Sequence, residues 1–372
     1  MNGFTRYVFR QLFVGMIFVT TGLTCIIWLS QSLRFVELIV NRGVGAGTFF
    51  YLTMLMLPNF LTVILPIALF CVVVFIYAKL ISDRELVVMR AAGVSQISLA
   101  KPALVLALIS VGIGYFLNLY LLPNSYRLFR EMQWDIRYNY SHVLLREGAF
   151  TNVNNNTTLY IRERTADGQL LGILVHDQSD PKNPFTLMAA RGALVESEAG
   201  ARVVMFKGNR QTVDNKTNQL SILYFDRYAF DLGKKVGNSQ DRHREPRERQ
   251  LGELFNIQSA NDVDPRDFGK YIVEAHKRLT SPILALGFAL IALASLITGS
   301  FSRRMQTQRI LVSIGLMVVL QAAALGIENI TARNLKLIPL MYAHVSIPVV
   351  LAFWFMMTSS SRGYKSPAAQ SA

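Results

Sequence analysis

Residues 82–93 read Ser-Asp-Arg-Glu-Leu-Val-Val-Met-Arg-Ala-Ala-Gly and lie between two long apolar segments. Ser82 and Glu85 have the spacing of a capping box, in which each side chain accepts a hydrogen bond from the backbone N–H of the other residue. Gly93 supplies the left-handed conformation that commonly ends a helix. The stretch is therefore predicted to be a short amphipathic helix that is available to a partner. A solvated connecting loop is the alternative.

The flanking segments belong to a chain with the composition of a membrane protein. Of its 372 residues, 52% are hydrophobic and 17% are charged, and several apolar runs exceed the ~18–20 residues that cross a hydrocarbon core. Cys25 and Cys71 fall inside such runs and are expected to be buried free thiols. The first run is too long for a cleavable signal peptide, so we expect it to be retained as a span. The predicted spans are residues 12–33, 49–78, 98–122, 279–301, 308–329 and 338–358.

The net charge of +14 indicates the orientation of the spans rather than a nucleic-acid partner. One side of the predicted membrane carries eleven basic and two acidic residues, whereas residues 124–278 contain 23 basic and 20 acidic residues. The positive-inside rule therefore places both termini and residues 82–93 in the cytoplasm and the 124–278 insert on the other side. The eleven basic residues are Arg6, Arg10, Lys79, Arg84, Arg90, Lys101, Arg303, Arg304, Arg309, Arg362 and Lys365.

The insert begins with a helical pattern and then changes to short strands. Asn124 is predicted to cap a helix from Ser125 to Asn139. Turn residues then recur about every ten positions, Gly208-Asn209 among them, which is typical of a β sandwich, a jelly roll or an open β groove. Residues 237–250 are charged, lack apolar periodicity and are predicted to be a flexible linker. The strand candidates are 158–164, 170–176, 185–190, 193–198, 202–206, 209–213, 220–226 and 228–232.

These patterns predict four parts. Asp264-Pro265 is expected to start an amphipathic lead-in helix to the fourth span, since a cap followed by proline is typical of helix starts. The parts are residues 1–123 with three spans and the 82–93 helix, 124–264 with the exterior helix, β domain and linker, 265–358 with the lead-in and three spans, and a disordered tail at 359–372.

The chain shows no catalytic or metal-binding pattern. Walker A, zinc-type and nucleophile-elbow sequences are absent, and the spans have almost no ionisable residues at their centres, which ion-coupled transporters need. We therefore expect no enzyme activity, cofactor or metal site, and expect energy from a nucleotide-hydrolysing partner that receives the 82–93 helix in a groove.

Basic residues also gather at the opposite mouth of the predicted membrane body. For each residue taken singly, ordinary interfacial snorkelling is the favoured interpretation; pairing with phosphates of an anionic lipid is the alternative hypothesis. They are Arg34, Arg42, Arg127, Arg130, Arg333 and Lys336.

Three stretches of the chain resemble the LptF/LptG permease family of the bacterial lipopolysaccharide export transporter. They are Leu65 to Leu80 continuing into Asp83 to Gly93, Leu144 to Phe150, and Glu274 to Leu279 followed by Pro282. Their order and the plan of three spans, a domain and three spans also match, so the resemblance covers nearly the whole chain. The Leu65 to Leu80 stretch is more similar to the LptF type.

The resemblance implies an α-helical inner-membrane protein with six transmembrane helices and an inserted periplasmic β-jellyroll domain. It implies a permease subunit that extracts lipopolysaccharide, paired with an LptG-type paralogue above two cytoplasmic LptB-type ATPases. A single-span LptC-type partner and an LptA-type periplasmic bridge would complete the assembly, and the first and fifth spans would line a lateral gate. Residues 82–93 would be the coupling helix, with Glu85 as an acidic contact to the ATPase. The implied coupling residues are Ser82, Asp83, Arg84, Glu85, Leu86, Met89, Arg90 and Gly93.

Two other classes of function fit parts of the pattern. A mechanotransmission or scaffold protein would also need the cytoplasmic helix and the exterior domain, but it would pass no lipid. A membrane-embedded hydrolase fits less well because no catalytic constellation is present.

Overall fold

The computed structural model describes two compact units. The described residues are 3–42, 45–138, 147–154, 156–165, 169–180, 183–197, 200–213, 219–231, 243–257, 263, 266–298 and 303–362. The helical unit comprises residues 1–31, 53–127 and 243–372, and the second unit, which carries the β sheet, comprises residues 32–52 and 128–242.

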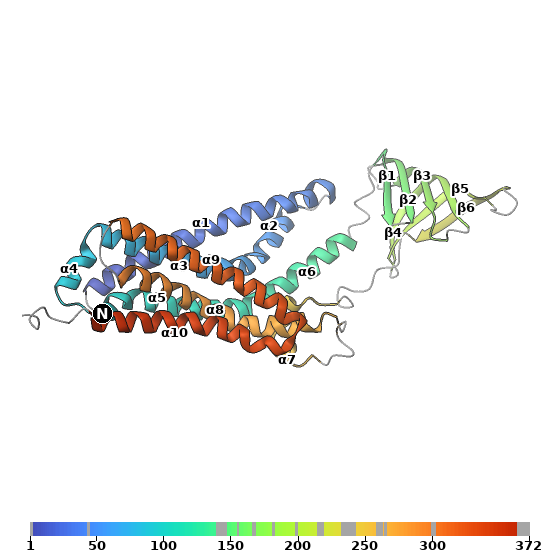
Figure 1. Cartoon of the computed structure of the whole chain (residues 1–372). Helices are drawn as coiled ribbons and strands as arrows, with labels where there is room; N and C mark the ends of the chain where they lie inside the picture. The colour runs from blue at the N-terminus through green and yellow to red at the C-terminus, as the bar shows by residue number, and fades with distance from the viewer. Residues whose placement is uncertain are drawn as a thin grey trace, which may run out of the picture. The chain divides into compact units, whose positions relative to one another are not determined.

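Helices form most of the chain (Figure 1). Six of them, in the described residues, are long and apolar enough to cross a membrane, which confirms the predicted helical membrane protein. The α-helices are α1 (Gly3–Arg42), α2 (Ala46–Leu55), α3 (Leu57–Ser82), α4 (Glu85–Ala91), α5 (Gln96–Phe116), α6 (Leu122–Tyr138), α7 (Leu251–Phe255), α8 (Phe268–Ile297), α9 (Arg303–Arg333) and α10 (Ile338–Arg362). Short π or 3₁₀ segments are η1 (Leu117–Leu121), η3 (Pro246–Glu248) and η4 (Leu335–Leu337).

Several predicted helix ends were wrong. The second span divides at Met56, because Pro58 stands at the start of α3 and provides no N–H for a continuous helix. The third span runs on through η1 into α6, so Asn124 lies inside a helix and caps nothing. The tail remains helical to Arg362. The predicted start at Asp264-Pro265 lies outside the described residues; α8 begins at Phe268.

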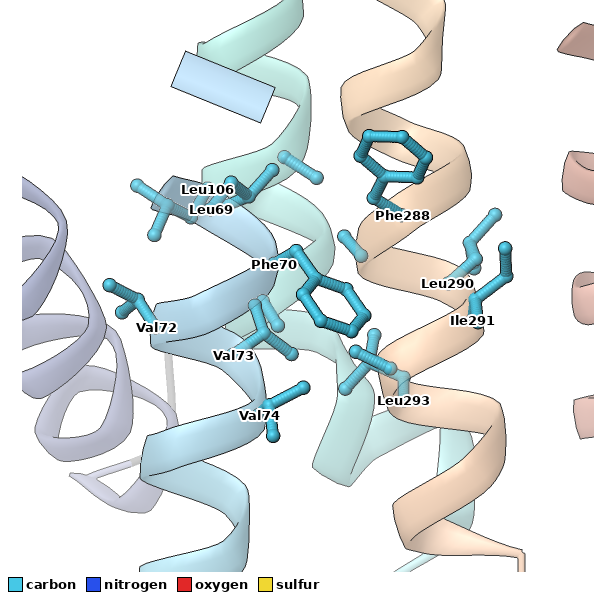
Figure 2. Close-up of a cluster of buried hydrophobic side chains, with 14 of the residues drawn as sticks. Leu69, Phe70, Val72, Val73, Val74, Leu106, Phe288, Leu290, Ile291 and Leu293 are labelled. Atoms are coloured by element: carbon cyan, nitrogen blue, oxygen red, sulfur yellow. The ribbon is translucent and has the colours of Figure 1, made fainter. Parts of the chain in front are cut away.

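The core of the helical unit is built around α8. In the most apolar 18-residue stretch of α8, 78% is buried, compared with 11% in the same stretch of α1 and 6% in that of α9. Phe288 on α8 packs edge-on against Phe70 on α3 with ring centroids 6.4 Å apart. Figure 2 shows this contact together with Leu69, Val73 and Leu106 from the neighbouring helices α3 and α5. By contrast, Cys25 and Cys71 are exposed free thiols, because each lies on the outward side of its helix and not on the core side.

The described residues of the second unit form an antiparallel sheet with the strand order β1-β2-β3-β4-β5-β6. The predicted inserted β domain is confirmed, and its described strands follow one another in sequence order across the sheet. Predicted strand pairs also merge, so that Gly208-Asn209 lies within a strand and not at a turn. The strands are β1 (Phe150–Asn154), β2 (Thr157–Arg164), β3 (Gln169–Asp177), β4 (Phe185–Ser197), β5 (Gly200–Val213) and β6 (Leu220–Asp231).

Apolar side chains from several strands of the sheet pack together into one buried cluster. Leu159, Val175, Leu187 and Met205 are almost fully buried and belong to one apolar cluster. Backbone at positive φ, 62° at Gly172 and 53° at Lys207, interrupts the two-residue side-chain alternation and allows long strands to bend. These irregularities explain why the sequence pattern suggested several short strands.

Candidate functional site

Helix α4 stands alone between α3 and α5 at one end of the helical unit. Its N-cap is Arg84, which has the left-handed backbone conformation with φ of 61° and makes no side-chain cap bond. Ser82 is still part of α3, and the N–H of Asp83 bonds the carbonyl of Lys79 at 2.9 Å. The predicted capping box between Ser82 and Glu85 was therefore wrong. Because α3 continues to Ser82, the change of direction into α4 takes place at Arg84, in its left-handed conformation.

The other end of α4 is as predicted. Gly93 has φ of 83°, its N–H bonds the carbonyl of Arg90 at 3.0 Å, and the N–H of Val94 bonds the carbonyl of Met89 at 3.1 Å. These two bonds form a Schellman motif, which satisfies carbonyl groups that a helix end would otherwise leave unpaired. The helix therefore ends at a defined point with an exposed glycine.

The two faces of α4 differ in their surroundings. Leu86 is fully buried in the core of the helical unit, and Met89 packs partly against the same cluster. Val88 has 64% of its surface exposed, and Ser82, Asp83, Arg84 and Gly93 are exposed as well. Glu85 is half-buried at the start of the helix. Leu86 thus holds α4 against the core, and the exposed residues present a surface that a partner can contact.

Arg90 points from α4 towards the core. Its Nη1 donates to the backbone carbonyl of Ile297 at the end of α8, at 3.1 Å. With its amide oxygen turned towards Arg90, the buried Gln96 at the start of α5 accepts from Nη2 at 3.1 Å and donates to the carbonyl of Met356 at 3.3 Å. Sequence reasoning placed Arg90 among the partner-contacting residues; the structure shows it connecting α4 to two other helices.

A basic pocket lies at the opposite end of α8. It is open, encloses about 630 Å³, and is lined by Arg266, Lys270 and Arg333 together with Phe268 and Leu335 of the same unit. Lys270 pairs with Asp267 at 2.7 Å, and Arg333 is exposed. The pocket can receive an anionic group through charge-assisted hydrogen bonds.

The predicted lipid-binding residues are divided between the two units. Arg333 lines the pocket, Lys336 is exposed on η4, and Arg127 lies on α6 in the helical unit. Arg34, Arg42 and Arg130 belong to the second unit, where Arg130 donates to Gln133 at 2.8 Å.

Sequence reasoning missed the role of Arg278. Only 1% of this side chain is exposed; it pairs with Glu274 at 3.2 Å and donates to the carbonyls of Pro246, Arg247 and Arg249 at 2.8 to 3.1 Å. The i, i+4 spacing of Glu274 and Arg278 was the available signal.

The part of the predicted linker that the structure describes, residues 243–250, is therefore held against α8. Residues 237–242 lie outside the described residues. In the described parts of the chain, no three His, Cys, Asp or Glu side chains form a metal-type cluster.

The comparisons with known proteins agree with this architecture. The family model "Lipopolysaccharide export system permease LptF/LptG" matches residues 6–360. An uncharacterized protein of Rickettsia prowazekii (strain Madrid E) is 26% identical over 357 residues, which is 95% of this chain and 98% of that protein. The lipopolysaccharide export system permease protein LptF of Escherichia coli (strain K12) is 25% identical over 235 residues, which is 62% of this chain and 64% of that protein.

Proposed function

The chain belongs to the LptF/LptG family of lipopolysaccharide export system permeases, and on that premise we propose that it is a non-catalytic subunit of an ATP-driven exporter. In this role it extracts lipopolysaccharide from the inner membrane and passes it to a periplasmic bridge. The observation that carries the proposal is the family match over residues 6–360 on a chain whose short helix α4 lies between two spans and has an exposed face.

The charge distribution supports a proposed orientation of the protein in the membrane. Basic residues gather at the α4 end of the helices, so both termini and α4 face the cytoplasm and the β sheet lies in the periplasm. Two ATPase subunits of the LptB type would then contact the exporter from below. We assign the contact on this chain to Glu85 and the exposed residues around it, Ser82, Asp83, Arg84 and Gly93, with Val88 as an apolar addition from the structure.

The uncovered helices support a partner and a lipid path. The α1 and α9 spans are only 11% and 6% buried, so each leaves a long apolar face for lipid or for a second permease of the LptG type. We propose that these two helices line the lateral gate. We also propose a single-span LptC-type partner and an LptA-type bridge, and the support for both is the family match.

The basic pocket beside Arg333 supports the lipid end of the proposal. Phosphate groups on an anionic lipid would accept from Arg333, and Arg127 and Lys336 add positive charge to the same unit. Arg34, Arg42 and Arg130 remain proposed contacts in the second unit. Photocrosslinking from each of these six positions to lipopolysaccharide tests the assignment; adducts confined to other positions would reject it.

Glu85→Ala in the reconstituted complex tests the coupling assignment. We expect ATP hydrolysis to continue and lipopolysaccharide release per ATP to fall by about tenfold, within the usual range of coupling free energies. Lys101→Gln, an exposed change on α5 at the same end of the molecule, serves as the matched control. Normal release by an assembled Glu85→Ala complex would disprove the coupling role.

A further inference from the structure

Helix α8 runs through the centre of the helical unit and touches most of the other long helices. It packs against α3, α5, α9 and α10, and Phe288, Ala289 and Leu293 in its middle are fully buried. Figure 2 shows buried side chains of α8, among them Phe288 and Leu293, on the side that faces Phe70 of α3. A close-packed interior has few voids to absorb a displacement, so a displacement of one end of α8 is not easily absorbed along its length.

The end of α8 near α4 is completed by a side chain from α4. The last carbonyls of a helix have no intrahelical donor, and Arg90 supplies one to the carbonyl of Ile297 at 3.1 Å. A guanidinium at this position also matches the negative end of the helix dipole. The connection is thus local, directional and made by the helix that we propose the ATPase moves.

The far end of α8 is connected in the same chemical way to the chain that returns from the β sheet. Arg278 donates from Nη1 to the Arg249 carbonyl and from Nη2 to the carbonyls of Pro246 and Arg247. The Glu274 carboxylate at 3.2 Å balances its charge. All three guanidinium nitrogens of Arg278 therefore donate, and a buried arginine fork bonded in this way fixes the geometry of what it holds.

Apolar packing continues this attachment beyond η3. Leu254 and Ile257 form a small buried cluster with Tyr271 and Ala275 of α8, and the Tyr271 hydroxyl donates to the Arg244 carbonyl at 2.6 Å. Residues 244–257, the return segment, are therefore attached to α8 by four hydrogen bonds to backbone carbonyls and by a common core.

Between Arg278 and Ile297, α8 contains a proline, Pro282, and α5 packs against the helix at this position. Pro282 cannot donate to the carbonyl one turn before it, and helices kink at such positions. Gly114 allows α5 to approach closely there, since an added Cβ would lie 3.1 Å from Pro282. The Tyr115 hydroxyl donates to the Leu279 carbonyl at 2.9 Å, so α5 also holds the backbone one residue beyond the Arg278 carbonyl, which Pro282 leaves without its helical donor.

We propose that α8 transmits the displacement of α4 to the return segment, with Arg90 and Arg278 as the positioning residues at its two ends. The inference rests on the proposed function in one respect, namely that nucleotide binding by a partner moves α4. Neither arginine takes part in chemistry. Arg90 joins α4 to a backbone carbonyl of α8, and Arg278 joins α8 to backbone carbonyls of the return segment.

The test measures a distance in the full complex. Cys25 and Cys71 are exposed, so they are first replaced by serine, and spin labels are then placed at Gly252, where an added Cβ would meet no atom within 4 Å, and at the exposed Val350 on α10, which is outside the proposed gate. Pulsed electron resonance compares nucleotide-free and vanadate-trapped complexes. We expect the distance to change with nucleotide in the parent protein, and the change to be lost in Arg90→Gln and Arg278→Gln.

Conservative variants separate positioning from general stability. Arg90→Lys keeps one donor for one carbonyl and should restore the distance change, whereas Arg278→Lys cannot bond three carbonyls and should not. Lys101→Gln and Glu253→Gln are exposed controls near the two ends. If Arg278→Gln fails to fold, as judged by its Tm, Arg90→Gln and its lysine rescue still decide the question.

The outcomes distinguish this inference from the proposed function. A full distance change in Arg90→Gln, or no change in the parent protein, overturns the inference even if lipopolysaccharide is released. A distance change in the parent that Arg90→Gln abolishes, without any lipopolysaccharide release, leaves the inference standing and rejects the proposed function.

Discussion

The Lys277 ammonium on α8 donates to the Glu328 carboxylate on α9 at 2.7 Å. The two side chains are only 32% and 23% exposed, and beside them lies a small cavity lined by Thr280, Ser281 and His344. The His344 Nε2 atom is buried and makes no hydrogen bond among the described residues. This polar contact joins the most buried span of the unit to the least buried one, so it contributes directly to the attachment of α9.

Replacing Glu328 by Gln should loosen α9 from α8. The variant leaves the Lys277 charge in a partly desolvated site without its partner, and we expect a loss of about 1.5–3 kcal/mol, the range for hydrogen bonds to charged groups. The measurement is the free energy of unfolding of the purified protein in bicelles. A double-mutant cycle with Lys277→Met should give a coupling energy of the same sign.

The chain offers a matched control for this experiment. Asp267 and Lys270 are also 2.7 Å apart, but their side chains are 48% and 65% exposed. Exposed pairs contribute little because water screens them, so Asp267→Asn should leave stability almost unchanged. Equal losses in both variants would show that the position of the Lys277–Glu328 pair is unimportant.

The large features of the fold could be predicted from the sequence because they depend on many residues. Span hydropathy adds over about 20 positions, so local exceptions such as the break at Met56 do not hide six spans. The Gly93 helix end was equally predictable, because left-handed backbone strongly favours glycine.

The errors came from contacts between parts of the chain that are far apart. Composition suggested a flexible linker at 237–250, and nothing in those residues shows that Arg278, some 30 positions later, holds their backbone. Ser82 has a capping-box spacing, but it is the last residue of α3 and so cannot cap α4. The same limit applies to the site: Arg90 reads as a surface cation until the end of α8 is placed beside it.

Gly269→Ala should separate α8 from α9 at the basic pocket. An added Cβ at this position would lie 2.0 Å from the backbone oxygen of Ala332, a distance that only a backbone shift can relieve. We expect a loss of several degrees in Tm and weaker retention of anions at Arg333. Gly252→Ala, where nothing lies within 4 Å, should be neutral or stabilising because alanine favours a helix. A Gly269→Ala protein as stable as the Gly252→Ala protein would contradict the close contact.

Acid should weaken the ion pair between Arg202 on β5 and Asp231 on β6. The Arg202 guanidinium beside Asp231 lowers the pKa of that carboxyl below its ordinary value. Because the folded-state pKa lies below the unfolded-state pKa, the stabilisation is present above the unfolded-state pKa and is lost as pH falls through the folded-state value. Arg202→Gln should raise the Asp231 pKa and remove this part of the acid dependence. Both residues are exposed, so the effect is small; Tm measured from pH 6 to pH 2 in the parent and the variant checks its sign, and identical profiles would contradict it.

Gly93→Ala should disturb the end of α4 without touching its contact with the core. The backbone at Gly93 has φ of 83°, where a Cβ costs about 1–2 kcal/mol, although no atom lies within 4 Å of the added carbon. The cost is therefore conformational, and Gly93→Asn should lose less than Gly93→Ala because asparagine tolerates left-handed backbone better. Leu86 keeps α4 attached in all three proteins, so hydrogen exchange should rise at the N–H groups of Gly93 and Val94 in the order Gly, Asn, Ala while the exchange of Leu86 stays slow. If the coupling surface requires a fixed α4 terminus, ATPase binding should weaken in the same order. An alanine variant as protected as the asparagine variant would contradict a conformational cost at Gly93.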